Sequence, residues 1–210
     1  MPKERFSLGL DIGTAFIKVV KLRFSDQHVE LCDFKLESAQ SGLAPLVKNI
    51  TQSKGKIRVI VSVSGPAAII RCISFPQMEE SELKQALKFE AEKHIPFPIS
   101  EVNIDGCVLK QNLPENKMLV MLAAEKKEVI NKLLKSVEEA GIKINIIDLD
   151  LLALANAFNF NYSDNENIKN KTIALLNIGA NFSNLNILEE GIPRLSRDIQ
   201  IVAGQQPAFS

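Results

Sequence analysis

Alternating apolar and polar residues near the start of the chain predict a β-hairpin. Residues 6–12 alternate between large apolar side chains and serine, glycine or aspartate, which is the period of a half-buried strand. Gly13 and Thr14 favour a turn, and a second β-rich run follows at 16–22. We therefore expect two antiparallel strands joined by a tight polar turn.

The same patterns predict a mixed α/β chain with another hairpin near its end. A period of two marks strands, whereas apolar residues at helical spacing mark amphipathic helices. Gly65–Pro66 is a candidate boundary between two units, and 159–171 form a polar connection. The expected strands beyond the first hairpin cover 29–36, 57–63, 68–75, 102–109, 117–124, 143–147, 172–178, 182–188 and 192–199. The expected helices cover 43–50, 79–94, 125–140 and 149–158.

Side chains around the first turn have the chemistry of a phosphate site. Gly13 lets a ligand approach the backbone, and the Thr14 hydroxyl and the turn N–H groups can donate to phosphate oxygens. Lys18 supplies positive charge from the returning strand, and Asp11 can hold a hydrated cation. An ordinary hairpin with a polar turn explains the same residues, so both interpretations stay open.

The pattern of the first turn occurs again late in the chain. Residues 10–14 read LDIGT and residues 176–180 read LNIGA, so each strand ends in a polar residue, an isoleucine and a glycine. Two such hairpins that face each other across a cleft could clamp the phosphates of a nucleotide. Plain repetition of strands is the alternative.

Composition excludes several classes of protein. The 210 residues, 23.2 kDa in all, suffice for one large domain or two small ones. Basic and acidic residues number 25 each, so the charge expected of a nucleic-acid-binding protein is missing. The longest apolar run, 118–124, is far shorter than the roughly 20 residues of a membrane-spanning helix, and no secretory signal opens the chain. We expect a cytoplasmic protein. Three cysteines and two histidines show no metal-ligand spacing.

The most specific stretch of the sequence is a helix followed by closely spaced prolines. Residues 89–105, FEAEKHIPFPISEVNID, resemble a segment of the PilM family, the actin-like cytoplasmic proteins of type IV pilus assembly. Residues 194–199, RLSRDI, are similar to the strand that follows the family's second phosphate loop. The helix–proline segment lies between the two hairpins, where PilM and its relative FtsA carry an extra subdomain called 1C.

This resemblance implies a mixed α/β fold of the actin-like (ribonuclease H-like) ATPase type, present in part. Residues 1–65 together with 149–160 would form subdomain 1A. Residues 66–148 would form the inserted subdomain 1C, and 172–210 would begin subdomain 2A. The chain ends before the rest of 2A, and we leave open whether it is a fragment or a natural short form.

The resemblance also implies a nucleotide site built from both hairpins, with Asp11 as the residue that holds the metal. Asn177 stands where the family has an aspartate, so it offers hydrogen bonds but no negative charge. We therefore expect ATP and Mg²⁺ to bind a full-length form, and neither to bind this chain tightly. The cofactor-binding residues implied by motif are Asp11, Gly13, Thr14, Lys18, Asn177 and Gly179.

By resemblance, the expected function is that of a non-enzymatic adaptor at the cytoplasmic face of the inner membrane. Its partner would be the N-terminal cytoplasmic tail of a PilN-like membrane protein, bound in a groove between 1A and 1C. Pilus assembly motor proteins would be further partners, self-association is a further expectation, and membrane contact would come only through partners. The groove residues that we expect from placement alone are Ile69, Ile70, Cys72, Phe75 and Phe97.

Two other functions stay open at this point. One is an ATP-binding enzyme of the actin-like and kinase superfamily that uses Asp11, Thr14 and Lys18. The other is a scaffold similar to the cytoplasmic part of the type II secretion protein L, which also has a reduced actin-like fold.

Overall fold

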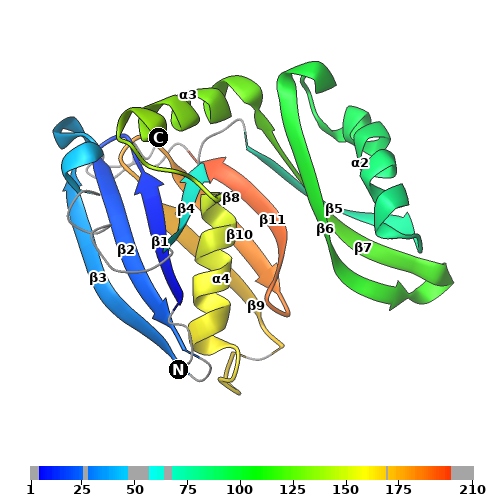
Figure 1. Ribbon diagram of the computed structural model, residues 1–210. Helices are drawn as coiled ribbons and strands as arrows, with labels where there is room; N and C mark the ends of the chain where they lie inside the picture. The colour runs from blue at the N-terminus through cyan, green and yellow to red at the C-terminus, as the bar shows by residue number, and fades with distance from the viewer. Residues whose placement is uncertain (1–4, 26–27, 47–56, 64–67, 169, 200–210) are drawn as a thin grey trace, which may run out of the picture.

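The first sheet carries the N-terminal hairpin in a computed structural model that describes residues 5–25, 28–46, 57–63, 68–168 and 170–199. Its five strands run in the order β3-β2-β1-β4-β8 (Figure 1). The β1–β2 and β2–β3 pairs are antiparallel, and β1–β4 and β4–β8 are parallel. The strands are β1 (Arg5–Ile12), β2 (Phe16–Phe24), β3 (Val29–Ser38), β4 (Ile57–Val63) and β8 (Ile146–Leu149).

One face of this sheet is covered by helix α3 (Lys127–Glu139). Alternate residues of the central strands, such as Leu8 and Val19, are fully buried there. Val137 of α3 packs among them. Of the helix expected at 43–50, residues 47–50 lie outside the described residues; residues 44–46 are helical, and Leu43 and Leu46 are buried in the same core. The first sheet and α3 therefore share one hydrophobic core.

A second sheet forms a separate layer with its own helix. Its order is β5-β7-β6, and every neighbouring pair is antiparallel. The strands are β5 (Ile69–Pro76), β6 (Val102–Leu113) and β7 (Lys117–Lys126). Helix α2 (Glu80–His94) covers one face because Leu83, Leu87 and Ala91 are buried against the sheet. The chain cannot continue this helix into Pro96, and α2 ends two residues before it.

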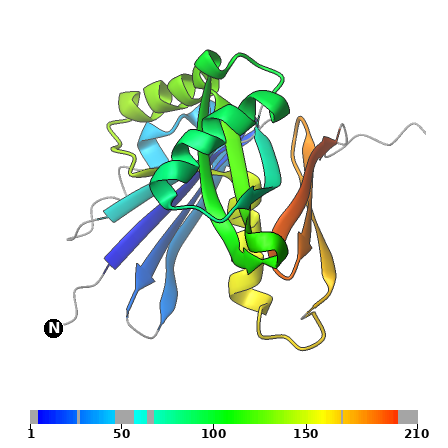
Figure 2. The same ribbon diagram turned by 90° about the vertical axis from the view of Figure 1, so that its right-hand side faces the viewer.

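The third sheet is an antiparallel meander in the order β11-β10-β9. Its strands are β9 (Thr172–Ile178), β10 (Ser183–Glu189) and β11 (Ile192–Ile199). Helix α4 (Asp150–Tyr162) contacts β4 and β8 of the first sheet and β10 and β11 of the third. Figures 1 and 2 show α4 between these two sheets. The two hairpins predicted from the sequence are confirmed.

The packing differs from the predicted subdomains over residues 127–148. We assigned 66–148 to one insertion, but β8 pairs with β4 of the first sheet and α3 packs on that sheet. The separate unit therefore consists of β5, α2, β6 and β7. The sequence could not show this because an apolar stripe on a helix does not identify the sheet that it covers. The predicted boundary at Gly65–Pro66 lies outside the described residues.

Two element boundaries also differ from the predictions for identifiable reasons. We expected a strand at 143–147, but β8 begins at Ile146, because the Asn145 side chain accepts a hydrogen bond from the Val59 N–H at 2.8 Å and replaces a ladder contact. We expected α4 to end at residue 158, but it continues to Tyr162. Asn159 stabilises the extra turn because its side chain donates to the Gly191 carbonyl at 2.8 Å.

Within the described part of the chain, no helix has both the length and the apolar character needed to span a bilayer.

Candidate functional site

The first hairpin holds its polar residues in a closed arrangement. Asp11 and Lys18 are cross-strand neighbours, and the Lys18 ammonium lies 2.8 Å from the Asp11 carboxylate. The Gly13 N–H donates to the Phe16 carbonyl at 3.0 Å, and a Cβ at Gly13 would lie 2.8 Å from that oxygen. The tight turn therefore needs glycine whether or not a ligand binds. Thr14 is exposed beside it.

The second hairpin repeats this turn geometry. A Cβ at Gly179 would lie 2.5 Å from the Phe182 carbonyl oxygen. Asn177 is half-buried and faces Asn184 across the β9–β10 pair. The Asn184 side chain in turn donates to the Asp198 carboxylate on β11. The repeated sequence motif thus corresponds to a repeated structure.

Asp150, at the start of α4, is a site residue that the sequence analysis missed. Its pKa is raised from 3.8 to about 6, chiefly by burial. The hydrogen bond from the Leu151 N–H lowers this pKa, the negative charges of Asp11 and Asp198 raise it, and Lys18 lowers it. The first hairpin, the start of α4 and β11 thus share one electrostatic neighbourhood. The available signal was an aspartate inside an apolar run, which we interpreted as part of a buried helix.

The donor groups at this neighbourhood fit a phosphate accompanied by a cation. The Thr14 hydroxyl and Lys18 can bind phosphate oxygens, and the carboxylates of Asp11 and Asp150 suit a hydrated divalent ion. Among the residues that the structure describes, no three His, Cys, Asp or Glu side chains gather as a metal-binding group. The metal role of Asp11 and the cofactor roles of both turns therefore stay predictions.

The five residues expected to form a partner groove do not share one surface. Ile69, Ile70 and Phe97 line a polar cavity of about 260 Å³ that also reaches Asp150 and Asp198. By contrast, Phe75 is buried in the core between the second sheet and α2. Cys72 lies on the opposite face from that core, where its thiol donates to the Pro193 carbonyl at 2.9 Å.

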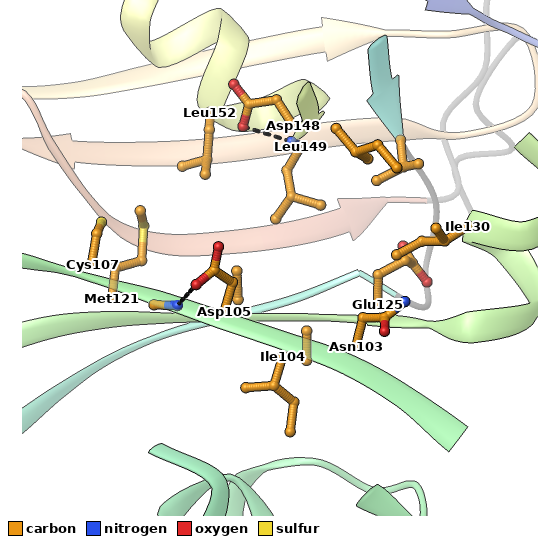
Figure 3. Close-up of a pocket in the computed structure, with 15 residues that line it drawn as sticks. Asn103, Ile104, Asp105, Cys107, Met121, Glu125, Ile130, Asp148, Leu149 and Leu152 are labelled. Atoms are coloured by element: carbon orange, nitrogen blue, oxygen red, sulfur yellow. Dashed lines mark hydrogen bonds between the residues drawn. The ribbon is translucent and has the colours of Figure 1, made fainter. Parts of the chain in front are cut away.

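A different groove lies between the second sheet and the end of the first. It encloses about 250 Å³ and is largely apolar (Figure 3). On β7, alternate residues such as Val120 and Leu122 face α2, whereas Met121 and Glu125 face this groove. The apolar side chains that line it include Met121, Ile130, Leu149 and Leu152, whereas the Ile104 side chain points to the α2 face of the sheet. We refer to this site as the β6–α4 groove; the sequence did not predict its residues.

Three carboxylates lie among these apolar residues. Asp105 accepts a hydrogen bond from the Gly106 N–H, and Asp148 accepts one from the Leu149 N–H, both at 2.8 Å (Figure 3). Glu125 accepts one from the Lys126 N–H, also at 2.8 Å. Burial raises the pKa of both Glu125 and Asp148. The groove thus combines apolar walls with acidic groups.

Comparison with known proteins places the chain in a family. The model of the family described as type IV pilus assembly protein PilM matches residues 9–207. The chain belongs to the PilM family. The resemblance inferred from residues 89–105 is therefore confirmed, and so is the connection with type IV pilus assembly.

Solved structures agree with this membership. A PilM family structure, the PilM–PilN type IV pilus biogenesis complex, matches with a TM-score of 0.77 at 25% identity, over 93% of this chain and 62% of that one. The chain thus spans less than two thirds of the PilM that it matches. The cytoplasmic domain of EpsL, an inner membrane component of the type II secretion system of Vibrio cholerae, matches with a TM-score of 0.55 at 13% identity, over 94% and 71% of the two chains. The predicted actin-like ATPase fold is confirmed, and the likeness to EpsL shows the fold alone.

Proposed function

We propose that this PilM family protein is a non-enzymatic adaptor that binds the N-terminal cytoplasmic tail of a PilN-like membrane protein in the β6–α4 groove. The observation that carries the proposal is the groove itself. Its walls are largely apolar, and they come from β6 and β7 of the second sheet on one side and from β8 and α4 on the other. The match to a PilM–PilN complex supports the choice of partner.

The groove is large enough to take a few side chains of a peptide. Its volume of about 250 Å³ is below the roughly 300–1,000 Å³ typical of pockets for small molecules and cofactors. A few apolar side chains of an extended segment would fill it and bury the exposed parts of Ile130 and Leu152. A bound tail would contact β6 and β7 on one side and β8 and α4 on the other.

Location and further partners follow from this proposal. A protein that holds the tail of an inner-membrane partner is held at the cytoplasmic face of that membrane without inserting into it. There it would link the partner to the pilus assembly motor proteins. Both statements belong to the proposal.

The test is a titration of a fluorescent tail peptide from the PilN-like partner, followed by anisotropy. Ile130→Ser removes an apolar groove residue on α3, and we expect it to weaken binding about tenfold or more. The matched control is Leu134→Ser, one turn later on α3 and outside the groove lining, which should bind like the wild type. The proposal fails if the tail peptide binds no tighter than a scrambled peptide.

Nucleotide binding is a second candidate function, and the convergence of Asp11, Lys18 and Asp150 favours it. When bound, ATP with Mg²⁺ would add negative phosphate groups near Lys18 and the turn of the first hairpin. Because Asn177 cannot supply the negative charge of an aspartate, and tight binding is expected only of a full-length form, we propose that this chain binds Mg-ATP weakly and does not hydrolyse it. Thermal shift with Mg-ATP tests the binding, and magnesium-dependent phosphate release by this chain would contradict the absence of catalysis.

A further inference from the structure

Glu125 is a buried carboxylate whose hydrogen bonding is incomplete. It is 4% exposed and follows Met121 and Ala123 along the groove-facing side of β7. One carboxylate oxygen, Oε1, accepts from the Lys126 N–H at 2.8 Å. The other, Oε2, is buried and has no hydrogen-bond partner among the described residues.

The side chains that line the groove carry an excess of negative charge. Figure 3 shows Asp105 and Glu125 on the strands of the second sheet and Asp148 on the opposite wall. Among the residues that the structure describes, the fifteen that line the groove include no lysine, arginine or histidine. The two lysines next to Glu125 in sequence contact other groups: the Lys126 ammonium lies 4.1 Å from the centre of the Phe97 ring, and Lys127 donates to the Ser100 carbonyl.

An occupant without hydrogen-bond donors would leave the acidic groups of the groove without a compensating partner. A purely apolar peptide would cover the carboxylates and leave Oε2 of Glu125 unpaired in a dry environment, which is costly. A cationic side chain would instead donate to Oε2 and compensate the acidic lining. Charge complementarity therefore favours an occupant with a cationic side chain.

We propose that the β6–α4 groove recognises a peptide in which a lysine or arginine is flanked by apolar residues, with the cation donating to Oε2 of Glu125. This inference rests on the proposed function, because it specifies the peptide that the same groove binds. The apolar neighbours would fill the walls formed by Met121, Ile130 and Leu152.

The experiment combines changes on both partners. The probe is the tail peptide, acetylated at its N-terminus so that only side chains carry positive charge, with each lysine or arginine replaced in turn by norleucine. Glu125→Gln keeps the size of the side chain and removes its charge. Its control is Glu128→Gln, which removes an equal charge from an exposed position on α3 that pairs with Lys132.

We expect Glu125→Gln and one norleucine peptide each to weaken binding about tenfold or more. The two changes together should weaken binding little more than either change alone, since both remove the same contact. Glu128→Gln should bind like the wild type. The norleucine series on wild-type protein reads out the contact even if Glu125→Gln folds poorly.

The outcomes separate the two proposals. If the tail peptide binds wild-type protein but neither Glu125→Gln nor any norleucine replacement weakens it, this inference is overturned and the proposed function stands. If the acetylated peptide does not bind at all while the unacetylated one does, the cation is the terminal amine and this inference is also overturned. If neither peptide binds, both the proposed function and this inference fail.

Discussion

Gly106, on β6, has no room for a larger side chain, because atoms of two neighbouring elements lie close to the position that a Cβ would take. A Cβ there would lie 2.7 Å from Leu87 Cδ1 of α2 and 2.9 Å from the Met121 carbonyl oxygen of β7. The leucine can move, but the backbone oxygen cannot move without disturbing the sheet. We expect Gly106→Ala to lower the free energy of unfolding by about 1–3 kcal/mol in urea titrations.

Gly9→Ala is the matched control for that measurement. Gly9 also lies in a strand, but the nearest atom to its Cβ would be the Val20 carbonyl oxygen at an ordinary 3.9 Å. Its stability should stay within about 0.5 kcal/mol of the wild type. Equal losses for the two variants would show that strand propensity, rather than close contact, determines the effect.

The raised pKa of Asp150 gives a prediction about pH. Its pKa is about 6 in the folded protein and 3.8 ordinarily, so between these values the folded state binds more protons than the unfolded state. This group therefore stabilises the fold as the pH falls through 6 and destabilises it once ionised. Asp150→Asn should raise the free energy of unfolding at pH 7.5 by up to about 2 kcal/mol, allowing for partial exposure to solvent.

At pH 4.5 the advantage of Asp150→Asn should shrink, because the wild-type carboxyl is then already neutral in the folded state. Burial also raises the pKa of Glu125 and Asp148, but these groups are present in both proteins and cancel in the comparison. Urea unfolding of both proteins at the two pH values measures the effect. An Asn variant that is less stable at pH 7.5 would contradict the assignment.

Local residue chemistry could be predicted where neighbours in sequence determine it. Asp11 and Lys18 flank one tight turn, and the structure pairs them as the hairpin pattern indicates. Asp150 and Glu125 could not be predicted, because their burial depends on strands far away in the sequence. For such groups, periodicity identifies the element but not the surroundings.

At the scale of elements, the sequence predicted the strands and helices but not always their partners. α3 was expected from its apolar stripe, yet its sequence neighbour β7 belongs to the second sheet while α3 covers the first. The groove of the proposed function results from this arrangement. It could not be predicted because it requires knowing that the chain returns to β4 through β8.

The position of α3 can be tested by removing volume from it. Val137 is fully buried between α3 and the first sheet, so Val137→Ala should cost about 2 kcal/mol of unfolding free energy. Leu134→Ala, on the same helix at a residue that is 39% exposed, should cost less than half of that. Similar losses at both positions would argue against the packing of α3 on the first sheet.

At the scale of the whole molecule, the β2–β3 edge of the first sheet exposes a row of apolar side chains. Val20 faces Phe34 across the strand pair, and Leu22 faces Leu31. Phe34 is 67% exposed, and Leu31 and Leu36 are also exposed. An apolar patch of this kind lowers solubility or supports association. Self-association of the protein stays a prediction.

Phe34→Lys should therefore reduce concentration-dependent light scattering without lowering thermal stability. The matched control is Phe89→Lys on α2, since Phe89 is almost equally exposed at 68% but lies outside the β2–β3 row. We expect the control to scatter light like the wild type. If both variants reduce scattering equally, general charge rather than the row explains the effect.

The position of Cys107 gives the groove a built-in reporter. This thiol, on β6 of the second sheet, is exposed and lines the groove, whereas Cys32 is exposed on β3, an edge strand of the first sheet. A bound tail would shield Cys107 from alkylating reagents and leave Cys32 unchanged. The ratio of the two labelling rates, read by mass spectrometry on the unmodified chain, would then measure occupancy of the groove, with one cysteine as the signal and the other as the internal standard.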